Sequence, residues 1–143
     1  MQVSELLQKK GDEVVVIDQS ATIGEALERL RLHDIGALVV SIDGKSIEGI
    51  LSERDVVRAL ARQGSSALEA PVRSVMSHAV HTCELNDSID SLMTVMTNFR
   101  IRHIPVTNQG ILAGIISIGD VVKTRMEELE RDRDALVNYI YAR

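Results

Sequence analysis

Two short motifs in this sequence pair a serine with an aspartate three residues later, Ser52 with Asp55 and Ser117 with Asp120. Each motif follows a short apolar run and precedes an amphipathic stretch, which predicts that it lies where a strand meets a helix. There the serine can cap the helix and the aspartate can complete a capping box. The same helix N-terminus offers N–H groups to a phosphate, and a carboxylate can accept both hydroxyls of a ribose. The motifs therefore fit a structural role and a nucleotide-binding role, which are compatible with each other.

Histidine and cysteine residues form a second group that could do chemistry. His78, His81 and Cys83 lie close together in the sequence, and His103 follows them. A zinc site needs three or four ligands in a set geometry, and no CxxC or HExxH spacing accompanies these residues. Cys83 also lacks the histidine and acid arrangement that would make it a nucleophile. We therefore predict neither a metal site nor a thiol enzyme.

The elements that must position these residues occur twice, because the chain contains an internal repeat. The apolar positions of one predicted helix recur 66 positions later, as Ile89, Leu92, Met93 and Met96 after Ile23, Ala26, Leu27 and Leu30. The Ser–Asp motifs recur 65 positions apart, because the second copy is one residue shorter in the preceding turn. Chance would not preserve helix face, strand and motif together, so the two units are predicted to share one fold.

Each unit is predicted to follow the order β-α-β-β-α. A β-branched run, 14–17 in the first unit and 80–83 in the second, opens the unit as a strand. The first helix begins at a capping box of Thr22 and Glu25 in one copy and at Ser88 in the other.

Two strands around a glycine turn follow the first helix in each copy, within residues 36–51 and 102–116. The segment GKSIEG at 44–49 lacks the spacing of a phosphate loop and is predicted to be part of this turn. The second helix of the first unit is expected to stop at Gly64, and residues 63–71 are predicted to be a linker between the units.

The predicted domains are unit 1 at 1–66, unit 2 at 67–124 and a helical tail at 125–143. The helix that carries the tail has apolar residues at alternating spacings of four and three, interrupted by Arg133. These apolar residues are Val122, Met126, Leu129, Leu136 and Ile140. Such a stripe predicts that the helix either folds back on its own domain or pairs with the tail of a second copy.

Composition limits the function classes. The chain has 143 residues and a formal net charge of −5, and 45% of its residues are hydrophobic but only 2% aromatic. The acidic balance disfavours nucleic acid as a partner, and the few aromatic residues disfavour stacking on RNA. One cysteine excludes an internal disulfide, and no apolar run is long enough for a signal peptide or a membrane span. We therefore expect a cytoplasmic protein that is not embedded in a membrane.

The repeated unit resembles a known family. The sequences GILSERD at 49–55 and GIISIGD at 114–120 resemble those of the cystathionine-β-synthase (CBS) domain pair, or Bateman module, and RIRHIPV at 100–106 is similar to its second-strand signature. The resemblance covers residues 3–124, which favours a stand-alone pair. It implies an α/β (α+β) fold, with two β-α-β-β-α units related by a pseudo-twofold axis, their sheets packed together, and a C-terminal helix.

The resemblance also implies two clefts, each combining the Ser–Asp motif of one unit with the opening strands of the other. One site would contain Ser52, Arg54, Asp55, His81, Arg102 and His103. The other would contain Val15, Gly36, Ala37, Ser117 and Asp120. Arg102 and His103 are interpreted as a phosphate clamp, with an exposed charge pair at a strand edge as the alternative. The small residues Gly36 and Ala37 admit a base but no clamp, so a polyphosphate should prefer the cleft of Asp55.

The function implied by the resemblance is regulatory rather than enzymatic. The expected ligand is an adenine nucleotide, AMP foremost, with ADP, ATP, NAD(H) or S-adenosylmethionine as alternatives and no catalytic cofactor. A homodimer and an unidentified regulated protein are the expected partners. A structural or partner-binding module with vestigial clefts is the competing hypothesis, and a metal-dependent enzyme and an RNA-binding protein are more distant ones.

Overall fold

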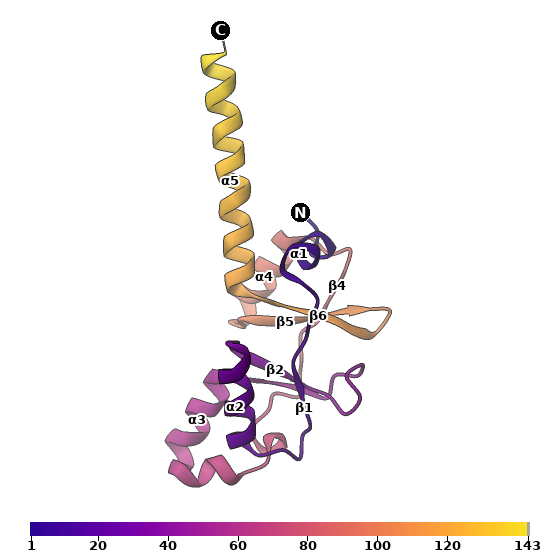
Figure 1. The fold of residues 1–143 in the computed structure, drawn as a ribbon, viewed down its shortest axis with the longest axis vertical. Helices are drawn as coiled ribbons and strands as arrows, with labels where there is room; N and C mark the ends of the chain where they lie inside the picture. Colours follow the sequence, from indigo (N-terminus) through magenta and orange to yellow (C-terminus); the bar gives the residue numbers. More distant parts are fainter. Residues whose placement is uncertain (143) are drawn as a thin grey trace.

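The computed structural model describes residues 1–142, and its elements repeat the predicted order β-α-β-β-α (Figure 1). The first unit contains β1 (Val16–Ile17), α2 (Ile23–His33), β2 (Ala37–Val40), β3 (Gly49–Ser52) and α3 (Glu53–Gln63). The second contains β4 (Cys83–Glu84), α4 (Ile89–Phe99), β5 (His103–Asn108), β6 (Ile111–Ser117) and α5 (Ile118–Tyr141). A helix α1 (Val3–Lys10) precedes both units, and two 3₁₀ helices, η1 (Gly64–Glu69) and η2 (Val72–Ser74), connect them.

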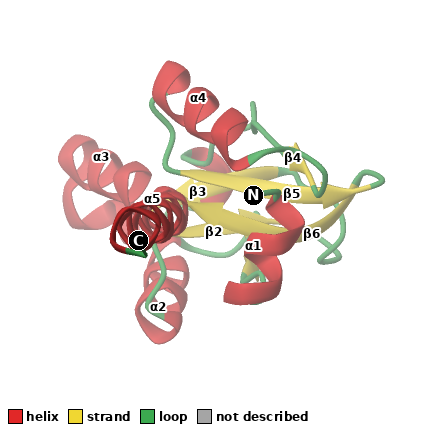
Figure 2. Ribbon diagram, turned by 90° about the horizontal axis from the view of Figure 1, so that it is seen from above, coloured by secondary structure: helices red, strands yellow, loops and turns green. Residues whose placement is uncertain are grey.

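Each unit has a three-stranded sheet, in the order β1-β2-β3 or β4-β5-β6. The first two strands of each sheet are parallel and the last two are antiparallel. The antiparallel register places Ala37 opposite Ser52 and His103 opposite Ser117. The residue that begins the middle strand therefore lies beside the serine that caps the following helix. Seen from above, the strands lie together with helices around them (Figure 2).

The opening strands are shorter than predicted. Only Val16 and Ile17 of the run 14–17 pair as β1, and β4 begins at Cys83, so the prediction of a strand through His81 is wrong. The reason is the path of the chain between the units. Ser77 is still hydrogen-bonded to Ile50 in the first unit, through its N–H at 2.9 Å from the Ile50 oxygen. Residues 78–82 must cross to the second unit before pairing can start.

Each hydrophobic core contains a segment that the predicted boundaries assign to the other unit. Val3, Leu6 and Leu7 of α1 are buried in the core of the second unit, beside α4 and β6. Ala67 and Val72 of the connecting segment are fully buried in the core of the first unit. The predicted boundaries at residues 1–66 and 67–124 follow the sequence repeat, whereas the packing crosses them.

The segment 63–71 connects the two units, as predicted, but it is packed rather than a free loop. Its glycine and serines indicated a loop, but η1 continues directly from α3 and buries Ala67 against the first core. The Ala70 carbonyl also accepts a hydrogen bond from the N–H of Ile23 at 2.9 Å, which ties the segment to the start of α2. The predicted stop at Gly64 is confirmed, since Gly64 is the C-cap residue of α3 with a φ of 65°.

The predicted C-terminal helix is present and does not fold back. α5 extends away from both units as a single helix (Figure 1). Only its first turns pack on the body, through Val121 and Thr124. Leu129 is 55% exposed and Leu136 is 61% exposed, so the apolar stripe of the tail has no partner within residues 1–142. None of the described helices combines the length and hydropathy that crossing a membrane would require.

Candidate functional site

The two Ser–Asp motifs are helix caps, as predicted. Ser52 caps α3, and its N–H donates to Asp55 Oδ2 at 2.9 Å. Ser117 caps α5, and its N–H donates to Asp120 Oδ2 at 2.9 Å. In both boxes the serine hydroxyl accepts a hydrogen bond from the N–H of the aspartate. Capping leaves room for a ligand, because the hydrogen bonds that the described residues make to these carboxylates all fall on Oδ2.

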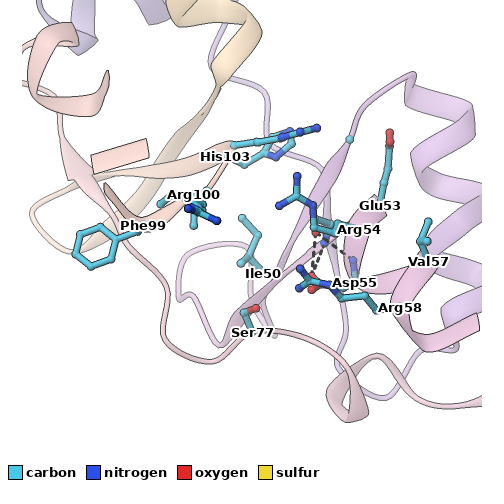
Figure 3. Close-up of a pocket in the computed structure, with 14 residues that line it drawn as sticks. Ile50, Glu53, Arg54, Asp55, Val57, Arg58, Ser77, Phe99, Arg100 and His103 are labelled. Atoms are coloured by element: carbon cyan, nitrogen blue, oxygen red, sulfur yellow. Dashed lines mark hydrogen bonds between the residues drawn. The ribbon is translucent and has the colours of Figure 1, made fainter. Parts of the chain in front are cut away.

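The larger cavity, called cleft 1 here, opens at the start of α3 and has a volume of about 720 Å³. It brings together five of the six residues predicted for the first site: Ser52, Arg54, Asp55, Arg102 and His103. They come from both units, because β5 approaches the N-terminus of α3 (Figure 3). The predicted combination of one unit's motif with the other unit's strand is therefore present.

His81 is the predicted residue that does not line cleft 1. Its ring instead packs on Phe99, with the ring centroids 4.2 Å apart. Phe99 does line the cleft, so His81 contacts a lining residue without lining the cavity itself. This position follows from the chain crossing at residues 78–82, which keeps His81 out of the sheet.

Sequence reasoning missed two arginines of cleft 1, Arg58 and Arg100. Arg58 lies one helical turn after Arg54 on α3, so the spacing could have revealed it. Arg100 ends α4 in a left-handed conformation, with a φ of 54°. With Arg54 and Arg102, four guanidinium groups line this cavity, against the carboxylates of Glu53 and Asp55. Its charge favours a ligand with phosphate groups.

The smaller cavity, called cleft 2 here, lies at the start of α5 and has a volume of about 310 Å³. It is lined by all five residues predicted for the second site: Val15, Gly36, Ala37, Ser117 and Asp120. It also contains two acids that were not predicted, Glu13 and Asp34. Asp34 ends α2 in a left-handed conformation, with a φ of 51°, as its repeat counterpart Arg100 ends α4. The same structural position therefore carries opposite charges in the two clefts.

His103 separates the two clefts and lines both of them. A Cβ atom at Gly36 would lie 3.2 Å from its ring, so the ring packs directly on this glycine. Burial lowers the pKa of His103, although the nearby Glu53 and Asp120 oppose the shift. The ring is therefore neutral at pH 7, and the cationic part of the predicted clamp is left to Arg102.

Lys10, which was not predicted, reaches cleft 2 from the end of α1. Its Nζ lies 2.6 Å from Asp120 Oδ2. Burial raises the pKa of Asp120, but the hydrogen bonds from Lys10 and Ser117 outweigh this and hold the pKa below its usual value. No local sequence pattern links residues so far apart, and only the exchange of segments between the cores brings them together.

The remaining histidine and cysteine residues do not form a site. Cys83 is buried in the second core, and burial raises the pKa of its thiol to about 12, with Asp87 and Glu84 adding to the shift. A thiol of this kind is a poor nucleophile at neutral pH. Within residues 1–142, no three His, Cys, Asp or Glu side chains are placed to hold a metal ion.

Comparisons with known proteins find the same domain in both halves of this chain. The family model for the CBS domain matches residues 3–62 and 72–127. The mitochondrial CBS domain-containing protein CBSX3 of Arabidopsis thaliana is 34% identical over 123 residues; the match covers 83% of this chain and 60% of that protein. The chain thus spans less than two thirds of this curated relative.

Two solved structures show the same fold. The CBS-domain containing protein ATU1752 from Agrobacterium tumefaciens is 46% identical, with a TM-score of 0.85, over 87% of this chain and 99% of that one. The CBS domain protein PAE2072 from Pyrobaculum aerophilum, solved in complex with AMP, is 30% identical, with a TM-score of 0.75, over 84% and 89% of the two chains. With two tandem matches and this fold, the chain belongs to the CBS domain family.

Proposed function

We propose that this protein is a regulatory module that binds adenosyl nucleotides in cleft 1 and cleft 2, AMP foremost. The observation that carries the proposal is that each cleft combines a helix N-terminus with an aspartate whose Oδ1 is left without a hydrogen bond by the described residues. A ribose hydroxyl can donate to that oxygen while the helix N-terminus faces a phosphate. The AMP complex of the Pyrobaculum relative supports this choice of ligand class.

The charges of the clefts suggest different ligands. Cleft 1 presents four arginines and is the larger cavity, so it suits a di- or triphosphate or the pyrophosphate of NAD(H). Cleft 2 has the acids Glu13 and Asp34 at its rim, so it suits a less charged adenosyl compound. S-adenosylmethionine, which carries a sulfonium cation, is therefore expected to prefer cleft 2. The proposed role is sensing rather than catalysis, which is the role that the tandem CBS domains of this chain favour.

A panel of ligands tests the proposal directly. Thermal unfolding of the protein, first shown to be free of bound nucleotide by mass spectrometry, should shift upward with at least one of AMP, ADP, ATP, NAD(H) and S-adenosylmethionine. A ligand at 100 times its dissociation constant adds about 2.7 kcal/mol to the stability. GTP is the matched control, because it carries the same ribose and phosphates on another base. Failure of every adenosyl compound to shift the transition would refute the proposal and favour a module that binds only a protein partner.

We further propose a homodimer, because apolar side chains of two helices remain exposed on the monomer. Val57 of α3 is 63% exposed, and Val122 and Met126 of α5 are 47% and 57% exposed. Exposed apolar residues on the surface of these two helices are typical of an interface. Light scattering at micromolar concentration should give twice the mass of one chain, and a monomeric mass would refute the dimer.

A further inference from the structure

Lys10 forms an ion pair with Asp120, a residue that lines cleft 2. Lys10 Nζ donates to Asp120 Oδ2 at 2.6 Å and to the carbonyl oxygen of Ile115 at 2.8 Å. The two side chains are 29% and 25% exposed, so the pair is mostly shielded from water. Asp120 and Ile115 both line the cavity. The ammonium group therefore contacts Oδ2 of the carboxylate whose other oxygen, Oδ1, is proposed to accept a ribose hydroxyl.

Packing of α1 fixes where Lys10 can reach. Leu7 is buried in the second core and lies against β6 so closely that a Cβ at Gly114 would be 2.8 Å from its Cδ2 atom. Lys10 follows Leu7 by one helical turn and is thereby held over the next residue of the strand, Ile115. The contact is thus a consequence of the exchanged segment rather than of a free side chain at the surface.

Hydrogen-bonding capacity decides whether the ribose and Lys10 can share Asp120. A carboxylate oxygen has two lone pairs, and those of Oδ2 are used by the N–H of Ser117 and by Lys10. One ribose hydroxyl can still donate to Oδ1, but a cis-diol that uses both oxygens needs the ammonium to leave. Asp55 differs, since its Oδ2 accepts only from the N–H and the hydroxyl of Ser52, and a hydroxyl can rotate away.

We propose that Lys10 is a specificity-determining residue of cleft 2, because it competes with the ribose diol for Asp120. This inference rests on the proposed function. The flexible stem of a lysine lets the ammonium leave without unwinding α1. Once released, the ammonium group can offset the negative charge of a bound phosphate, which otherwise faces the acids Glu13 and Asp34. A neutral nucleoside gains nothing from this cation. Lys10 thus weakens the binding of neutral nucleosides to cleft 2 relative to that of a monophosphate such as AMP.

The test compares Lys10→Met with the matched control Lys9→Met. Both substitutions are made in an Asp55→Ala chain, so that the measured binding comes from cleft 2. Lys9 is the exposed neighbour on the same helix. Titration calorimetry with adenosine should give about 2- to 5-fold tighter binding for Lys10→Met, the upper part of the range for an ion pair near the surface. 2′-Deoxyadenosine, which lacks the diol, should change less than twofold, and AMP should gain less than adenosine. Lys9→Met should behave as its parent with all three probes.

The outcomes separate the two proposals. Adenosine affinity that is unchanged or weaker in Lys10→Met, or equal gains for adenosine and 2′-deoxyadenosine, would overturn the competition while leaving the proposed function intact. A parent chain with both aspartates that binds no adenosyl compound would overturn the proposed function, and this inference with it. If the Asp55→Ala chain is unstable, the same comparison is made in the otherwise unchanged chain with a two-site fit, and the same results decide it.

Discussion

Replacing Asp55 by alanine should remove one of two binding events. The variant loses the carboxylate that faces cleft 1 and is proposed to accept a ribose hydroxyl. A hydrogen bond to a charged group contributes about 1.5–3 kcal/mol. This corresponds to about 10- to 150-fold in affinity. Asp120→Ala should do the same for cleft 2 and leave cleft 1 unchanged.

The same substitution also removes a helix cap, and this effect has to be separated from binding. Asp55 Oδ2 accepts the N–H of Ser52, so its loss should lower the free energy of unfolding by about 0.5–2 kcal/mol. Glu25→Ala is the matched control, because Glu25 completes the capping box of α2, where it accepts the N–H of Thr22 at 3.1 Å, and lines neither cleft. The control should lose similar stability and keep both binding events.

Titration calorimetry with AMP and ATP, together with urea unfolding, measures both quantities on the three variants. Asp55→Ala should retain only the binding event of cleft 2, and Asp120→Ala only that of cleft 1. Glu25→Ala should retain both binding events. Parental binding of every nucleotide by both aspartate variants would mean that these residues serve only as helix caps.

Four further outcomes are expected. Arg102→Ala should weaken ATP binding more than adenosine binding and reduce its salt dependence in calorimetry, and equal losses would make it a mere strand-edge charge. Gly49→Ala should destabilise the protein by about 1–3 kcal/mol in urea, because its Cβ would lie 2.8 Å from the backbone oxygen of Ser77, and an unchanged midpoint would contradict this. Leu129→Glu should halve the mass in light scattering if the exposed stripe of α5 lies in a dimer interface. Because the pKa of the Cys83 thiol is raised to about 12, the folded protein should react slowly with a thiol reagent from pH 7 to 9, whereas fast reaction would show that the thiol is accessible.

The repeat explains why much of the fold and most of the cleft residues could be predicted. Capping boxes such as Ser117 with Asp120 depend on three or four neighbouring residues, so their geometry follows from local sequence. The repeat then showed which elements correspond, and the resemblance to the CBS pair indicated how the units face each other. Asp34 and Arg100 occupy equivalent positions 66 residues apart but could not be predicted, because a charged residue at the end of a helix is usually exposed to solvent and carries no local signal of a cavity.

Three features of the structure depend on contacts between residues far apart in the sequence, which no local sequence pattern predicts. Lys10 meets Asp120 only because α1 is buried in the core of the second unit. His81 is outside cleft 1 because the chain crosses between units there, and a β-branched neighbour is equally compatible with a strand or a crossing. The segment 63–71 has the composition of a loop, and the burial of Ala67 becomes visible only when the first core is assembled.

The exchange of segments between the two cores makes the repeat units thermodynamically inseparable. Without α1 the second core would expose the surface that Val3 and Leu6 cover, and without Ala67 and Val72 the first would be incomplete. The halves should therefore melt in a single cooperative transition rather than as two independent domains. A molecule bound in either cleft should therefore stabilise both units against unfolding, including the base of α5.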